Sequence, residues 1–137
     1  MRIETYLEAR KLLRPAPTRS LLFLRRALKT KNRRLVRDRW GRGDSGCIVQ
    51  HLGRFHPACR QTRDYGLNYL ALCGVTGELY DPERGTICGS YLVHDFDFQD
   101  VTEEELARLI ASELRDRGVL RLRNRGERLA TAGEVAR

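Results

Sequence analysis

The strongest constraint on the fold is a helix signal in residues 101–118. Thr102 and Glu105 have the spacing of a capping box, and Val101 precedes them as one partner of a hydrophobic staple. Gly118 stands where a helix commonly ends in a glycine. Between them, apolar residues recur at helical spacing, at Leu106, Leu109, Ile110 and Leu114. We therefore predict an amphipathic C-terminal helix whose apolar stripe packs against the rest of the domain.

A first N-terminal helix is predicted over residues 3–13, and Pro15 and Pro17 then end it. The spacing of its apolar side chains would place them on one face of the helix. The residues of that face are Ile3, Tyr6, Leu7, Ala9 and Leu13.

A second N-terminal helix begins with Thr18 or Ser20 as its N-cap and ends near Asn32. Its apolar stripe, which we expect to be buried, consists of Leu21, Leu24 and Leu28. The basic residues that fall mainly off this stripe are Arg25, Arg26 and Lys29. The helix should therefore present a basic face to solvent.

Four β-strands are expected between these helices. Runs of β-prone residues at 35–40 and 47–52 flank the sequence GRGDSG, a pattern typical of a hairpin. The first run could instead continue the second helix. Residues 67–73 and 86–98 are interpreted as further antiparallel strands. The predicted fold class is α+β: two N-terminal helices, a largely antiparallel four-stranded sheet, and the C-terminal helix packed on that sheet.

Length and composition indicate one domain. The chain has 137 residues, of which 41% are hydrophobic and 32% charged, so it can bury a single core. We expect an α+β domain over residues 1–125, with a basic helical part in residues 1–43, and a flexible tail over residues 126–137. No stretch approaches the ~20 apolar residues of a membrane span, and the first residues lack the order of a signal peptide. We therefore expect a protein that does not bind membranes and is cytoplasmic, or one from a compartment that proteins enter without cleavage.

Positive charge is concentrated in the N-terminal third. Residues 1–43 contain fourteen Lys or Arg and three acidic residues, whereas the remaining chain has twelve basic and fifteen acidic residues. Such asymmetry indicates an anionic partner, because crowded like charges destabilise a fold unless something relieves them. Nucleic acid is the commonest partner of this kind, and an acidic protein surface within a nucleoprotein complex would satisfy the same electrostatics.

The predicted function is therefore a non-catalytic module that binds nucleic acid or a nucleoprotein complex. Arginine predominates in the basic stretch, and its planar guanidinium matches phosphate oxygens. An aromatic side chain at the end of the stretch, Trp40, could stack on a base or ribose. The expected phosphate contacts are Arg25, Arg26, Lys29, Lys31, Arg33, Arg34, Arg37, Arg39 and Arg42. The alternative is a protein-interaction subunit, or a small inhibitor, that docks onto a nucleic-acid-processing complex through helix two.

A zinc site is a further possibility. Four residues of ligand type lie within a short span: Cys47, His51, His56 and Cys59. Their separations only approach those of structural zinc sites, and buried intracellular cysteines more often pack as small hydrophobic residues. We expect no cofactor, with zinc as the alternative.

The last predicted strand offers an enzymatic alternative. Alternation places Asp95 and Asp97 on one face of this strand, where two carboxylates could share a divalent cation in a phosphodiesterase or nuclease. His94 is the nearest histidine but would face the opposite side, with Phe96 and Phe98. The more ordinary interpretation is that these acidic side chains complement the helix that follows.

Overall fold

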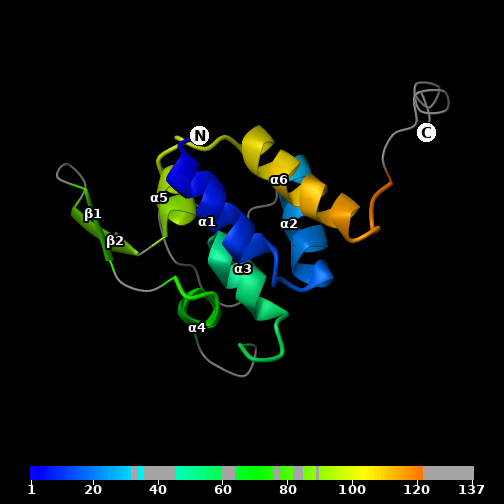
Figure 1. Cartoon of the computed structure of the whole chain (residues 1–137), viewed down its shortest axis with the longest axis horizontal. Coiled ribbons are helices and arrows are strands. Elements are labelled where there is room, and N and C mark those ends of the chain that lie inside the picture. The colour runs from blue at the N-terminus through cyan, green and yellow to red at the C-terminus, as the bar shows by residue number, and fades with distance from the viewer. Residues whose placement is uncertain are drawn as a thin grey trace.

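The structure is a computed structural model that describes residues 1–31, 34–35, 46–59, 64–75, 78–81, 85–88 and 90–121. Within these ranges the chain forms six helices and one two-stranded antiparallel hairpin (Figure 1). The helices are α1 (Ile3–Leu13), α2 (Thr18–Thr30), α3 (Ile48–Arg54), α4 (Tyr65–Leu72), α5 (Tyr91–Asp97) and α6 (Glu103–Asp116). The strands are β1 (Glu78–Asp81) and β2 (Gly85–Cys88).

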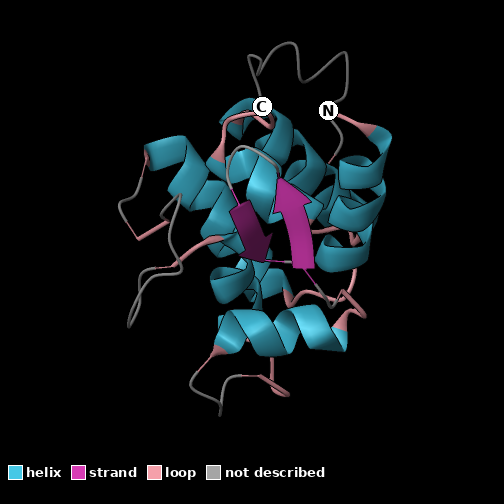
Figure 2. Cartoon of the chain, turned by 90° about the vertical axis from the view of Figure 1, so that its left-hand side faces the viewer, coloured by secondary structure: helices cyan, strands magenta, loops and turns pink. Residues whose placement is uncertain are grey.

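The predicted four-stranded sheet, and with it the α+β class, is wrong. Cys47 is the N-cap of α3 and residues 48–52 lie within this helix. Residues 67–73 belong mainly to α4, and residues 86–98 divide between β2 and α5. Of the run at 35–40, only Leu35 is described, and it forms an isolated bridge with Gly46. Figure 2 shows β1 and β2 side by side in front of the helices, and no third strand of the described residues joins them.

Two of the misassigned segments, α3 and α5, share one physical property, which is burial of most of their residues. In α3 every residue from Ile48 to Gly53 is buried, and in α5 every residue from Leu92 to Phe96 is buried. A helix without a solvent-exposed face shows no 3.6-residue alternation of polar and apolar residues. A short apolar helix therefore cannot be distinguished from a buried strand by periodicity.

The C-terminal helix prediction is confirmed, but its partner differs. Thr102 and Glu105 form the capping box at the start of α6, and Gly118 has a positive φ of 77° just beyond its end. The stripe residues Leu106, Ile110 and Leu114 are fully buried. Their helix packs on α2 and α1, not on a sheet.

The N-terminal helices are confirmed with two corrections. Pro17, not Thr18 or Ser20, occupies the N-cap position of α2, and the helix ends at Lys31 in the left-handed conformation. In α1 the bounds are as predicted, and Ala9 and Leu13 of the predicted apolar face are buried. Ile3 and Leu7 of that face are 62% and 59% exposed, and Thr5 and Leu12 are buried in their place.

Helices α3 and α4 pack in unusually close contact. A Cβ atom placed on Gly53 of α3 would lie 2.4 Å from the carbonyl oxygen of Tyr65 in α4. Nearby, the buried Tyr69 hydroxyl donates a hydrogen bond of 2.5 Å to the Leu12 carbonyl, and burial raises the pKa of Tyr69. This side chain therefore ties α4 to the end of α1.

Residues 126–137, for which a tail is predicted, lie outside the described ranges.

Candidate nucleic-acid interface

A groove of about 780 Å³ lies where α2 approaches the end of α3. Six basic side chains and two phenylalanine rings dominate its lining. The lining residues are Arg19, Leu22, Phe23, Arg25, Arg26, Lys29, Thr30, Arg34, Arg54 and Phe55. None of these described residues is acidic. A concave surface that carries one sign of charge attracts and concentrates ions of the opposite sign.

Most of the groove comes from α2 because this helix is amphipathic. Its leucine stripe faces the core, and Leu28, the least buried of the three, is only 6% exposed. Arg19, Phe23 and Arg26 follow one another at spacings of four and three residues, which places them on a shared face away from that stripe. Arg19 and Arg26 are exposed, whereas the Phe23 ring is half-buried.

The rest of the lining consists of Arg34, which follows α2, and of the end of α3. Arg54 is its last residue and Phe55 is its C-cap. The two helices are joined just before this point, because the buried Ser20 hydroxyl of α2 donates a hydrogen bond of 3.0 Å to the Leu52 carbonyl. This contact fixes the end of α3 beside the basic face of α2.

Arginine and phenylalanine side chains alternate across the groove. The Phe23 ring centre lies 4.8 Å from the guanidinium carbon of Arg34 and 5.1 Å from that of Arg54. Arg54 also lies 4.9 Å from the centre of the Phe55 ring, and Arg19 lies 4.5 Å from it. Stacking uses the face of a guanidinium and phosphate recognition uses its N–H edge, so one side chain can do both.

His51 anchors the segment that carries Arg34. Its Nε2 lies 2.7 Å from the Arg34 carbonyl oxygen, which also accepts a hydrogen bond of 2.8 Å from the Gly46 backbone N–H. The imidazole packs against the Phe23 ring at 4.6 Å between centroids. Burial, together with the charges of Arg54 and Arg34, lowers the pKa of His51 to about 4. The ring is therefore neutral near pH 7, and Nε2 carries the proton because a carbonyl only accepts.

The structure brings together part of the predicted basic set. Arg25, Arg26, Lys29 and Arg34 line the groove. Lys31 lies on an adjoining surface. The predicted residues outside the described ranges are Arg33, Arg37, Arg39, Trp40 and Arg42.

Six lining residues of the groove were not predicted from the sequence, and four of them are arginine or phenylalanine. Arg19 and Phe23 could have been found by extending the helical face of Arg26 towards the N-terminus. Arg54 and Phe55 could not, because nothing in the sequence indicates that the end of α3 meets α2 there.

Acidic side chains border the basic face of α2 on its other side. The adjoining surface, which contains Arg25, Lys29 and Lys31, also contains Glu103 and Glu104 from the start of α6. The groove and this adjoining surface therefore differ in charge, and the groove is the more favourable of the two for an anion.

The candidate zinc ligands are not assembled into a site. Cys47 precedes α3 and His51 lies within it, where the imidazole contacts the Arg34 carbonyl. His56 accepts a hydrogen bond of 3.1 Å from the Ala58 backbone N–H at Nδ1. Among the residues that the structure describes, no three or more His, Cys, Asp or Glu side chains are placed to hold a metal ion.

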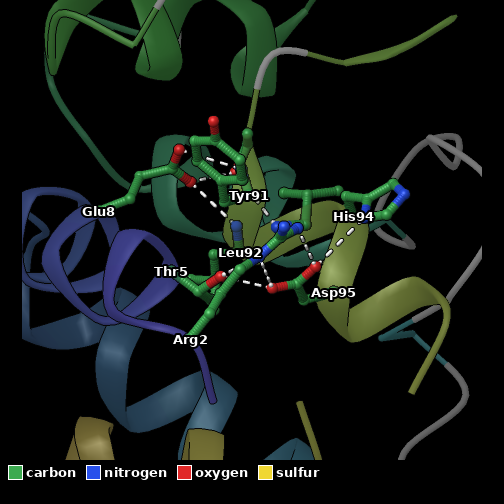
Figure 3. Close-up of polar contacts among 9 residues, drawn as sticks. Arg2, Thr5, Glu8, Tyr91, Leu92, His94 and Asp95 are labelled. Atoms are coloured by element: carbon green, nitrogen blue, oxygen red, sulfur yellow. Dashed lines mark hydrogen bonds and ion pairs between the residues drawn. The ribbon is translucent and has the colours of Figure 1, made fainter. Parts of the chain in front are cut away.

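The carboxylates of the enzymatic alternative do not share a face, because residues 91–97 form α5. Positions two apart on a helix point roughly 200° away from each other, so Asp95 and Asp97 diverge. Asp95 is instead bound by α1 (Figure 3). Arg2 donates to its two carboxylate oxygens at 2.7 and 3.0 Å, and the Thr5 hydroxyl and His94 Nδ1 also contact it.

A second polar contact of the same helix pair completes this interface (Figure 3). The Glu8 carboxylate accepts hydrogen bonds of 3.0 Å from the backbone N–H groups of Tyr91 and Leu92. The Ser90 side chain caps the same helix end by accepting from the Val93 N–H at 3.1 Å. These groups explain why Thr5 and Glu8 of α1 face α5, while Ile3 and Leu7 are left outside.

Comparison of the chain with protein-family models, with curated proteins and with solved structures finds no match. None of the described helices is both long and apolar enough to cross a membrane.

Proposed function

We propose that this protein is a non-catalytic nucleic-acid-binding module that holds its ligand in the groove between α2 and the end of α3. The observation that carries the proposal is a concave surface on which six cations gather around two aromatic rings, with no acidic side chain among its described lining residues. Neutralising phosphates releases condensed counterions, and this release supplies most of the sequence-independent affinity for nucleic acid.

The arginine and phenylalanine stacking supports the proposal because it orders the guanidinium groups before a ligand arrives. A long side chain fixed on binding costs about 0.5–1.5 kcal/mol of conformational entropy. Arg19, Arg34 and Arg54 already lie against Phe23 or Phe55, so part of that cost falls on folding and not on binding. A net charge of +8 would also accelerate the encounter with a polyanion. The cytoplasmic location expected from the sequence belongs to this proposal.

The test compares two double variants that lower the net charge equally. Arg19→Gln with Arg26→Gln removes two cations of the groove, whereas Arg10→Gln with Arg115→Gln removes two exposed arginines outside it. Fluorescence anisotropy with a labelled oligonucleotide should show an affinity loss of about tenfold or more for the first pair. The second pair should lose only a few-fold. Equal losses would mean that net charge alone, and not the groove, determines binding.

A second candidate function, protein interaction within a nucleic-acid-processing complex, is favoured by a separate observation. Ile3, Tyr6 and Leu7 of α1 are 62%, 38% and 59% exposed and share one helix face. Exposed apolar side chains in a contiguous group mark contacts with other proteins. A complex formed through this face should survive nuclease treatment and should be lost in the Ile3→Ser, Leu7→Ser variant, while oligonucleotide affinity stays unchanged.

A further inference from the structure

We infer that the groove recognises the sugar-phosphate backbone and not the bases of its ligand. This inference rests on the proposed function and specifies the ligand chemistry of the same site. It concerns what the two phenylalanine rings do. They could stack on bases, as aromatic side chains do in many proteins that bind single strands, or they could hold arginines for phosphate contact.

The contacts of the rings favour the second role. Phe55 has two guanidinium groups over it, those of Arg19 and Arg54, at 4.5 and 4.9 Å from its centre. Phe23 has Arg34 and Arg54 over it at 4.8 and 5.1 Å, and His51 packs against it as well. A base that stacked on either ring where these groups lie would have to displace a guanidinium group. The rings therefore act as supports for the cations.

The remaining lining offers little that could read base edges. Bidentate recognition of adenine uses Asn or Gln, and recognition of cytosine uses Asp or Glu, and none of these residue types occurs among the described residues of the groove. Of the residue types that recognise base edges in this way, the described lining contains only Arg and Lys, and the base that they recognise is guanine. The Thr30 hydroxyl is already engaged, because it donates a hydrogen bond of 2.8 Å to the Arg26 carbonyl. What the groove presents is a set of cations, and these are suited to phosphates.

The inference predicts that removing an aromatic ring weakens binding equally whether or not the ligand has bases. The probes are a fluorescein-labelled oligothymidylate and an oligomer of the same length built from abasic sites. Wild-type protein should bind the two within about threefold of each other, because the phosphates are the same. Phe55→Leu should weaken both by the same factor, roughly threefold to tenfold, since Arg19 and Arg54 lose their support.

Two further variants serve as controls. Phe55→Tyr keeps an aromatic face and should retain wild-type affinity for both oligomers. Phe98→Leu makes the same change as Phe55→Leu at the C-cap of α5, outside the groove, and should alter neither affinity. Circular dichroism confirms that each variant is folded. Trp40 is present in every protein compared, so any contribution it makes to affinity cancels when the dissociation constant of a variant is divided by that of the wild type.

The outcomes separate the inference from the function on which it rests. A Phe55→Leu loss confined to the oligothymidylate would show that the ring stacks on bases, which overturns the inference and leaves nucleic-acid binding intact. Unchanged affinity of Phe55→Leu for both oligomers would overturn it as well, because the ring would then position nothing. If wild-type protein binds neither oligomer, the proposed function itself is wrong.

Discussion

The guanidinium of Arg2 binds both carboxylate oxygens of Asp95, joining the N-cap of α1 to a helix 93 residues further along the chain. Asp95 is almost completely buried, whereas the Arg2 side chain is 47% exposed. Burial by itself would raise the pKa of Asp95, but hydrogen bonds from Arg2, Thr5 and His94 outweigh it and hold the pKa below its ordinary value. The charged carboxylate is therefore a structural group that stabilises the folded state.

Replacing Asp95 should destabilise the fold in a pH-dependent way. We expect Asp95→Asn to lower the free energy of unfolding by about 2 kcal/mol near neutral pH, because Arg2 and Thr5 lose a charged acceptor. A group with a depressed folded-state pKa stabilises above its unfolded pKa, and this contribution disappears as pH falls through the folded value. Urea denaturation should therefore show that the variant and wild type converge in acid. The exposed Asp116→Asn serves as the control, and a constant difference at every pH would contradict the prediction.

His51 should remain neutral across the physiological range. Its pKa of about 4 lies below the ordinary 6.5, so the unfolded chain binds a proton that the folded protein excludes. Stability should consequently fall as pH drops from about 7 towards 4, by up to roughly 3 kcal/mol from this group. NMR of the ring should show no titration between about pH 5.5 and 8 and an Nε2–H tautomer. A midpoint near 6.5 would show that the imidazole is not buried as described.

Gly53 should tolerate no side chain. In Gly53→Ala the new methyl group would meet the Tyr65 carbonyl at 2.4 Å, so α3 and α4 would have to separate, at a cost of about 2–3 kcal/mol. Gly118→Ala is the comparison, because its φ of 77° is strained for alanine although no atom lies within 4 Å, and we expect a loss of only about 1 kcal/mol. Thermal denaturation of both variants tests whether Gly53→Ala loses more stability than Gly118→Ala. A milder effect at Gly53 would contradict it.

Arg117 should stabilise the junction of three helices. Its guanidinium donates to the Leu13 and Arg14 carbonyls at 3.0 and 2.9 Å, and to the Thr18 hydroxyl at 3.0 Å. Arg117→Met keeps much of the apolar stem but leaves these acceptors without their donor, so we expect a loss of about 1–2 kcal/mol. The matched Arg115→Met, on an exposed position of α6, should change stability by less than about 0.5 kcal/mol. Chemical denaturation of the two variants provides the measurement.

Nucleic-acid affinity should depend steeply on salt. If the six cations of the groove each neutralise a phosphate of a single strand, the plot of log K against log salt concentration has a slope of about −4 from the groove alone. In the Arg19→Gln, Arg26→Gln variant the magnitude of this slope should be smaller by about 1 to 2. Titrations at several salt concentrations measure both values. A flat response in wild-type protein would contradict phosphate recognition.

Local signals determined much of the helical framework from the sequence. The capping box of Thr102 and Glu105 and the leucine stripe of α2 depend on residues within a few positions of one another, so they can be recognised without knowing any long-range contact. The secondary structure of the segments that form α3 and α5 could not be predicted in this way. Residues such as Val49 and Leu92 are buried on helices without a polar face, and their helical state depends on the neighbours that surround them.

The same division applies to the site. The sequence by itself determined that positive charge gathers in the N-terminal third, and helical spacing indicated that Arg25, Arg26 and Lys29 would avoid the core. Only the tertiary structure brought Arg54 and Phe55 beside them and paired Asp95 with Arg2. The physical reason is that charge and periodicity are properties of neighbouring residues in the chain, whereas a groove or a buried ion pair depends on which helices the hydrophobic core brings together.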